Sequence, residues 1–231
     1  MNASGSAPAL IGIGRFGTAL ARRLGSGIWL ADCDLNQARR IGRLTGAAVD
    51  TVEALLHCSE VLLVTVPPQA VIDLALSHRT RLKEGAIWVN FATSVDNATI
   101  ANALARPDVR VVGCKPVAQA TALALGLPAI FVSASPEDEC RRRLAQIIAP
   151  AGVLVMGDEH KVCYMNAEAT RIALRLARNL HHRLAGLPAP LIDAALKNVV
   201  VGTLMDFPED IDNPYIQARL VEIEQAQEES P

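Results

Sequence analysis

The sequence predicts an α/β fold, in which a doubly wound parallel sheet is followed by a small all-α C-terminal part. Short apolar runs alternate with helical segments as far as residue 157, and this alternation is typical of a mostly parallel sheet with helices on both faces. Beyond that point apolar residues recur every three or four positions, and no further strand is indicated. The predicted domains are therefore 1–157 for the sheet and 158–231 for the helices.

The composition indicates a globular protein with an aliphatic core. The 231 residues carry a formal net charge of −2, and 51% are hydrophobic but only 3% aromatic. A near-neutral chain with few aromatics argues against nucleic-acid binding, and no apolar run reaches the length of a membrane span. The start lacks the layout of a signal peptide, so we expect a cytoplasmic protein. The five scattered cysteines are expected to be free thiols, and no metal site is expected.

The first strand-to-helix turn carries the most specific motif. A buried strand is predicted over 9–13, and Gly12, Gly14 and Gly17 form the pattern G-x-G-x-x-G. In such a turn the first glycine permits a tight bend, the second lets the backbone approach a pyrophosphate, and the third allows close helix–strand packing. The amides that open the helix then face the phosphates. The residues expected to bind the dinucleotide here are Gly12, Ile13, Gly14, Arg15, Phe16 and Gly17.

An acidic residue ends the second predicted strand, 28–31. Asp32 follows Gly12 by 20 positions, where a carboxylate can accept hydrogen bonds from the adenosine ribose and would repel a 2′-phosphate. This favours NAD over NADP. Asp34 is a competing candidate, and Arg39 and Arg40 lie close enough in the sequence to leave the choice of cofactor open. The alternative for the whole segment is an ordinary tight turn in an α/β core.

The other elements of the sheet domain follow in order. Strands are predicted over 61–66, 86–91, 109–113, 129–133 and 153–156. A capping box at 50–53 predicts a short helix through His57, and Ser135 followed by Pro136 predicts the start of a later one. Ligands of an open α/β sheet bind beyond the carboxyl ends of its strands. This rule adds Val66, Pro67 and Thr93 to the cofactor site.

Three helices are predicted after residue 157. The first has about 28 residues and ends at Gly186, the second runs from Pro190 to about Met205, and Asn213-Pro214 can open the third. The first helix carries a long apolar stripe, and three helices in about 70 residues offer too little partner surface to bury it. We therefore expect a homodimer that forms through these helices. The stripe consists of Val162, Met165, Ala169, Ile172, Leu176, Leu180 and Leu184.

This layout resembles the superfamily that contains pyrroline-5-carboxylate reductases, β-hydroxyacid dehydrogenases and 6-phosphogluconate dehydrogenases. The stretch 61–69 resembles a reductase strand followed by Lys-Pro-Gln, with Pro67 in the place of the lysine. The stretches 85–94 and 115–133 resemble dehydrogenase segments, and Gly202 is similar to a glycine of the reductase dimerisation domain. The resemblance implies an N-terminal Rossmann domain, a C-terminal helical domain and hydride transfer with a nicotinamide dinucleotide.

The sequence departs from the family where the family places its chemistry. The dehydrogenases carry a catalytic lysine at the start of the long helix, with an asparagine four residues later. Here Lys161 and Asn166 are five apart, which separates their side chains by about 140° around a helix. The Ser-Gly-Ser-Gly-Pro stretch of the reductases is absent. The resemblance therefore supplies a cofactor site but no catalytic mechanism.

Four polar residues are the catalytic candidates. Lys115 could pair with a substrate carboxylate or donate a proton, or it could be a solvated surface lysine. Lys161, Tyr164 and Asn166 cluster, with His160, where the family places its catalytic side chains. The predicted function is NAD(P)-dependent hydride transfer to or from a small imine, keto acid or hydroxy acid. The alternatives are a dinucleotide-binding regulatory or scaffold protein without catalysis, and an enzyme that uses a deazaflavin.

Overall fold

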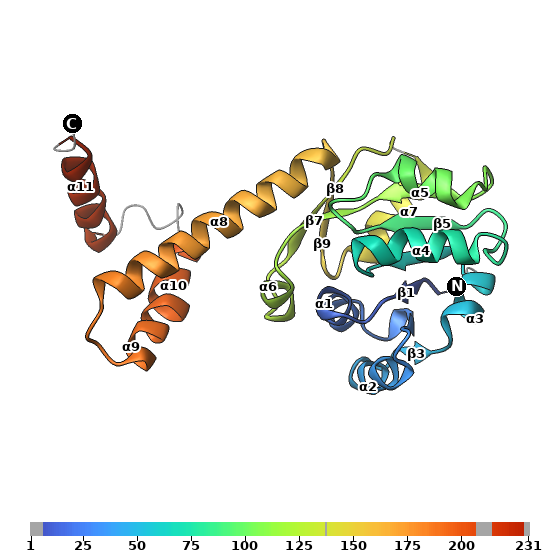
Figure 1. Cartoon of the computed structure of the whole chain (residues 1–231), viewed down its shortest axis with the longest axis horizontal. Helices are drawn as coiled ribbons and strands as arrows, with labels where there is room; N and C mark the ends of the chain where they lie inside the picture. Colours follow the sequence, from blue (N-terminus) through green and yellow to red (C-terminus); the bar gives the residue numbers. More distant parts are fainter. Residues whose placement is uncertain (1–6, 137, 207–213, 229–231) are drawn as a thin grey trace. The chain divides into compact units, whose positions relative to one another are not determined.

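The structure is a computed structural model that describes residues 7–136, 138–206 and 214–228 (Figure 1). The chain divides into two compact units, Met1–Glu168 and Ala169–Pro231, and each is described by itself. The division falls inside the long helix that begins the predicted helical domain.

Six parallel strands of the first unit form one sheet in the order β3-β2-β1-β4-β5-β6 (Figure 1). The chain winds outward from β1 to β3, returns to place β4 beside β1, and then winds the other way. The predicted Rossmann fold is thereby confirmed, and its ligand-binding position is the crevice where the order reverses. The strands are β1 (Ala9–Ile11), β2 (Trp29–Ala31), β3 (Ala48–Val49), β4 (Val61–Val64), β5 (Ile87–Asn90) and β6 (Arg110–Gly113).

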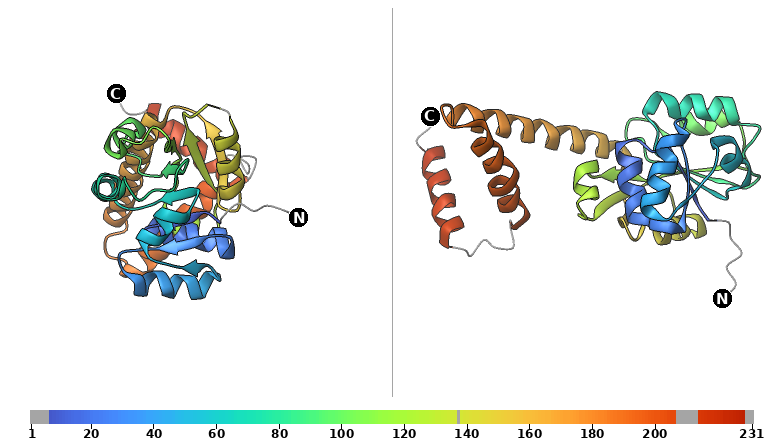
Figure 2. Two further views of the ribbon diagram at one scale, coloured as in Figure 1. Left: turned by 90° about the vertical axis from the view of Figure 1, so that its right-hand side faces the viewer. Right: turned by 90° about the horizontal axis from the view of Figure 1, so that it is seen from below.

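Helices cover both faces of this sheet. Successive strand residues point to opposite faces, so each strand contributes side chains to two cores. Leu10 and Leu63 belong to the core under α1, α2 and α7, whereas Ile11 and Leu62 belong to the core under α3, α4 and α5. Figure 2 shows α4 and α5 on one side of the strands and α7 on the other. The helices are α1 (Arg15–Leu24), α2 (Leu35–Thr45), α3 (Val52–Cys58), α4 (Pro68–His78), α5 (Asn97–Leu104) and α7 (Glu139–Ile148).

A second, three-stranded sheet completes the first unit. Strands β7 (Lys115–Val117), β8 (Ala129–Ser133) and β9 (Gly152–Met156) lie in that order, with β7 antiparallel to β8. Helix α6 (Ala120–Ala124) connects the first two. No strand is predicted at 115–117, because that stretch contains a lysine and a proline. A proline is tolerated there, since β7 is the edge strand of its sheet.

Two helix starts differ from the sequence prediction. Thr51 caps α3, with its hydroxyl accepting from the amide of Ala54 at 3.2 Å, so the cap lies one residue after the start of the predicted capping box. Helix α7 begins at Glu139 and is capped by Asp138, which accepts from the Arg141 amide at 3.0 Å. The predicted Ser135 cap is wrong, because a cap side chain must reach an amide two or three residues on.

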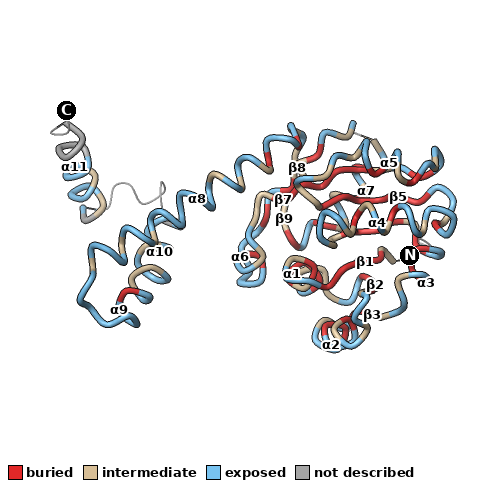
Figure 3. Tube along the Cα trace, in the orientation of Figure 1, coloured by how far each residue is buried: buried red, intermediate tan, exposed pale blue. Residues whose placement is uncertain are grey.

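The long helix α8 (Glu159–Arg183) begins in the first unit and continues into the second. After it come α9 (Ala189–Ala194), a π-helical segment (Ala195–Val200), α10 (Val201–Asp206) and α11 (Pro214–Glu228). Among the described hydrophobic residues of the second unit, Ile192 alone is buried, and Figure 3 shows its helices largely exposed. None of the described helices combines the length and the apolar character needed to cross a bilayer.

Candidate functional site

The glycine turn between β1 and α1 has the geometry that its motif predicts. Gly12 has φ +97°, and a Cβ atom there would lie 2.6 Å from the Cγ1 of Val66. A Cβ on Gly17 would lie 1.9 Å from the carbonyl oxygen of Gly12, which also accepts from Thr65 Oγ1 at 2.7 Å. Nothing lies within 4 Å of the corresponding position on Gly14. The chain's own packing thus requires the first and third glycines, whereas the second opens onto free space.

The N-terminus of α1 is free to receive an anion. Its N-cap residue is Gly14, no side chain caps it, and its first turn contains no acidic residue. The exposed Arg15 is the first residue of the helix. Amide groups and the positive end of the helix dipole therefore point out of the turn without a competing carboxylate in that turn.

Asp32 is bound to the glycine turn at the carboxyl end of β2. Its Oδ2 accepts a hydrogen bond from the amide of Ile13, and its Oδ1 accepts from the amide of Asp34 at 2.8 Å. The nearby carboxylate raises the pKa of the Cys33 thiol through a hydrogen bond and through its charge. Asp34 instead caps α2, accepting from the amides of Asn36 and Gln37. Of the two acidic candidates, Asp32 is therefore the one that faces the ligand crevice.

A cavity of about 420 Å³ extends from the glycine turn between α3 and α4; we call it the larger cavity. Gly12, Gly14 and Asp32 line its rim, and its walls are mostly apolar. Two predicted cofactor residues, Val66 and Pro67, also line it. The other lining residues are Ile11, Cys33, Val52, Thr65, Ala70, Asp73, Leu74, Ser77 and His78.

A second cavity, of about 270 Å³, lies on the other side of the β4–α4 turn; we call it the smaller cavity. Thr65 and Val66 line both cavities, so the two adjoin at this turn. Phe16 and Phe91 form one aromatic wall, with ring centroids 5.9 Å apart. The remaining lining residues are Pro68, Ala92, Thr93, Pro116, Ala118 and Asn166.

Asn166 is the one catalytic candidate that lines the smaller cavity. Its Nδ2 donates to the carbonyl oxygen of Pro116 at 2.8 Å, which ties α8 to β7. Tyr164 is 70% exposed, and the exposed Lys161 lies 3.9 Å from Asp158. Neither of them lines the larger or the smaller cavity. The structure thus brings Asn166 to the crevice and leaves Lys161 and Tyr164 outside it.

Lys115 is buried, not a solvated surface residue. Its side chain is only 2% exposed, and Nζ donates to the carbonyl oxygens of Ala92 and Val95 at 2.6 and 2.9 Å. Burial lowers its pKa to about 8, against the opposing effects of Glu159 and Asp96. Lys115 lines a third cavity, of about 260 Å³, which we call the lysine pocket. That pocket shares Thr93 with the smaller cavity.

Most of the residues that line the cavities, and all of the hydrogen bonds between buried polar groups, were not predicted from the sequence. Thr65 and Phe91 are ordinary residues at strand ends, and nothing in their type marks them. Glu159 lies beside the candidates chosen on α8, yet it is the buried charged residue of that turn, at 7% exposure. One signal was available: Asn90 is a polar residue that ends the apolar run of β5, and buried polar groups are normally hydrogen-bonded to something specific.

The fold and the glycine turn place the chain in the Rossmann class of α/β proteins. No protein-family model matches the sequence, and no curated protein matches it. Among solved structures, the chain is similar to a pyrroline-5-carboxylate reductase from Coxiella burnetii, with TM-score 0.71, 15% identity, and coverage of 97% of this chain and 90% of that one.

Two further solved structures have the same fold. A Plasmodium falciparum pyrroline carboxylate reductase with NADP bound has TM-score 0.67 and 12% identity, over 95% of this chain and 90% of that one. A 3-hydroxyisobutyrate dehydrogenase from Mycobacterium tuberculosis has TM-score 0.61 and 16% identity, over 81% and 69%. The predicted resemblance to this superfamily is confirmed at the level of the fold.

Proposed function

We propose that the chain is an NAD(P)-dependent oxidoreductase, which transfers a hydride between a nicotinamide dinucleotide and a small imine, keto acid or hydroxy acid. The observation that carries this proposal is the pair of cavities that adjoin at the β4–α4 turn. They lie beside an uncapped helix N-terminus at the reversal point of the sheet. A dinucleotide has two halves joined by a pyrophosphate, and it fits two adjoining pockets that are each lined by residues of the anion-binding glycine motif.

The larger cavity is suited to the adenosine half. Asp32 reaches its rim, where a carboxylate accepts from ribose hydroxyls and repels a 2′-phosphate. We therefore propose NAD as the preferred cofactor. The reductase from Plasmodium falciparum was solved with NADP, so this preference would distinguish the present chain from that neighbour.

The smaller cavity is suited to the nicotinamide ring and the reacting part of the substrate. When bound, the cofactor supplies or accepts the hydride. The phenylalanine rings and Val66 supply apolar surface, while the Thr93 hydroxyl and the Asn166 amide provide polar groups beside it. These two side chains can orient the oxygen or nitrogen of a carbonyl, hydroxyl or imine group and stabilise charge that develops on it.

Binding and turnover together test the proposed function. NADH and NADPH are titrated against the full chain by fluorescence, and a panel of cyclic imines, keto acids and hydroxy acids is screened by nicotinamide absorbance. We expect saturable binding and turnover of at least one substrate class. Tight binding without any turnover would favour the alternative, a regulatory protein without catalysis, to which the exposed position of Lys161 lends support. Absence of binding would contradict both.

Replacing Asn166 with alanine is expected to lower kcat/KM by about 10- to 100-fold, because a hydrogen bond to a developing charge contributes about 1.5–3 kcal/mol. The effect should fall mainly on kcat. Asn179→Ala is the matched control, since Asn179 is an exposed asparagine of the same helix. Equal kinetics for the two variants would remove Asn166 from the reaction.

We also propose that the chain forms a homodimer through its second unit. Eleven large hydrophobic residues of its described part are exposed, more than an isolated unit of this size normally leaves in water. They are Ile172, Leu174, Leu176, Leu187, Leu191, Val199, Val201, Leu204, Met205, Val221 and Ile223.

Light scattering coupled to gel filtration is expected to give the mass of a dimer. The double variant Ile172→Glu/Leu176→Glu should give the mass of a monomer, because both side chains lie on one face of α8, four residues apart. Leu44→Glu, which changes a 61% exposed leucine on α2 of the first unit, is the control and should remain dimeric. A monomeric parent chain would disprove the assembly.

A further inference from the structure

Two buried side chains, those of Lys115 and Asn90, form hydrogen bonds to the backbone of the turn that carries Thr93. Lys115 Nζ donates to the carbonyl oxygens of Ala92 and Val95, the residues at either end of the turn. Asn90 adds a second clamp, with Nδ2 donating to Val95 O at 2.8 Å and Oδ1 accepting from the amide of Ala92 at 3.0 Å. This wall of the smaller cavity is therefore fixed by hydrogen bonds from outside that cavity.

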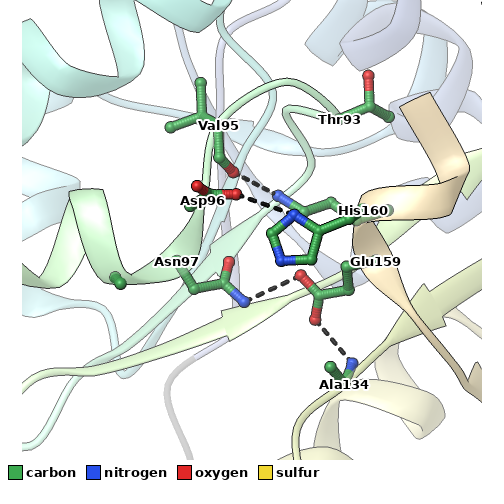
Figure 4. Close-up of a pocket in the computed structure, with 9 residues that line it drawn as sticks. Thr93, Val95, Asp96, Asn97, Ala134, Glu159 and His160 are labelled. Carbon is green, nitrogen blue, oxygen red and sulfur yellow. Dashed lines mark hydrogen bonds and ion pairs between the residues drawn. The ribbon is translucent and has the colours of Figure 1, made fainter. Parts of the chain in front are cut away.

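Glu159 connects the same network to helix α8 (Figure 4). Its Oε2 accepts from Asn97 Nδ2 at 2.9 Å, and its Oε1 accepts from the amide of Ala134 at 2.7 Å. Asn97 in turn accepts from Asn90 Nδ2 at 3.0 Å. The end of β6 makes room for the carboxylate, because a Cβ on Gly113 would lie 1.9 Å from Oε2 of Glu159. Hydrogen bonds thereby attach the first turn of α8 to α5 and to the residue that follows β8, and through Asn97 to β5.

Because the start of α8 is anchored, the position of another side chain on this helix is also determined. Asn166 follows Glu159 by seven residues, which is two turns, so both lie on the same face of α8. Glu159 fixes the start of that face, and Asn166 projects from it into the smaller cavity. Thr93 and Asn166, two of the polar side chains that line the smaller cavity, are thus both positioned from the lysine pocket.

Stability alone does not account for these buried charges. Removing an ammonium or a carboxylate from water costs several kcal/mol, and apolar side chains of similar volume often serve equally well. The lowered pKa of Lys115 shows that its partners do not fully compensate for burial.

We propose that Lys115 and Glu159 are positioning residues: the ammonium clamps the Ala92–Val95 turn and the carboxylate anchors α8, so that Thr93 and Asn166 face one cavity. This rests on the proposed function, since it assigns that cavity to the nicotinamide ring. Lys115 then acts through the backbone and does not meet the substrate.

The variant Lys115→Met of the full chain tests the clamp without any substrate. We expect the amides of residues 92–97 to exchange hydrogen for deuterium at least tenfold faster, with residues 9–31 unchanged. NADH should bind about 3- to 30-fold more weakly, whereas ADP-ribose, which lacks the nicotinamide, should bind as it does to the parent chain. Lys83→Met is the matched control, because Lys83 forms a surface ion pair with Glu60. Glu159→Gln should also weaken the binding of NADH.

The pH dependence separates positioning from a purely structural role. The charged groups that face Lys115 are Glu159 and Asp96, with His160 also in the pocket, and the neighbouring Cys114 is a thiol whose pKa burial raises well above its usual value. As pH rises through about 8, Lys115 loses its charge and its hydrogen bonds weaken. The turn should loosen, and NADH affinity should fall in the parent chain but not in Lys115→Met.

The contribution of Lys115 to global stability should move in the opposite direction. Because the folded-state pKa of Lys115 lies below its ordinary value of 10.5, the folded chain binds fewer protons than the unfolded chain between those values, and this residue's contribution to stability rises with pH there. Exchange and NADH binding that match the Lys83→Met control would overturn the proposal, and so would a NADH affinity that follows global stability. If the parent chain binds no NADH, the proposed function fails, while the exchange measurement still decides the clamp.

Discussion

Gly17→Ala is expected to abolish dinucleotide binding and to lower the free energy of unfolding by about 3 kcal/mol, at the upper end of the usual overpacking effect. The added methyl group would lie 1.9 Å from the carbonyl oxygen of Gly12. That atom belongs to the backbone of a tight turn, so it cannot move as a flexible side chain does. Relief requires α1 to shift away from β1 and β4, which displaces the amides that would face the pyrophosphate. Thermal melting and NADH titration measure the two effects.

Gly14→Ala is the informative control for this result. Its methyl group meets nothing in the protein, so melting should match the parent chain closely. NADH affinity should nevertheless fall, because the open space at Gly14 is where a pyrophosphate would approach the backbone. If Gly17→Ala melted like the parent chain and bound NADH equally well, Gly17 would not be required for the close packing of helix and strand.

Asp32→Ala is expected to weaken NADH binding by about 10- to 100-fold, because hydrogen bonds to a charged group contribute about 1.5–3 kcal/mol. NADPH should be affected far less, since the substitution also removes the charge that repels a 2′-phosphate. The ratio of the two dissociation constants is the measured quantity. An unchanged ratio would contradict the assignment of Asp32 to the ribose.

The neighbouring carboxylate provides the control for Asp32. Asp34 accepts from the amides of Asn36 and Gln37 at the start of α2, and loss of such a cap typically costs about 1 kcal/mol. Asp34→Ala should therefore lower the melting temperature while leaving the preference between NADH and NADPH unchanged. The two aspartates are two residues apart, yet one faces the crevice and the other belongs to the helix.

The sequence predicted the parts of the molecule that depend on local pattern. The glycine turn, the strand before it and Asp32 are specified within a few dozen residues, and each lies where the motif requires. The 140° offset between Lys161 and Asn166 also followed from helix geometry, and it agrees with a structure in which Asn166 lines a cavity and Lys161 is exposed.

Features that depend on distant contacts could not be predicted in this way. The burial of Lys115 arises because β7 begins directly after β6 and under the turn that follows β5. The role of Glu159 requires Asn97, Ala134 and the bare backbone of Gly113, which are scattered over the sequence. Lysine and glutamate side chains are usually solvated. Residue type alone therefore indicates exposure for Lys115 and Glu159, whereas both are buried.

Helix α8 has a consequence for how this molecule can change. It runs without interruption from Glu159 to Arg183, and the two compact units divide within it. Within the first unit, the helix carries both Glu159, which accepts hydrogen bonds from Asn97 and from the amide of Ala134, and Asn166, which donates to the carbonyl oxygen of Pro116. Two helical turns separate these residues, and no loop lies between them to absorb a displacement. A substitution that shifts the first turn of α8 is therefore expected to shift the amide of Asn166 as well.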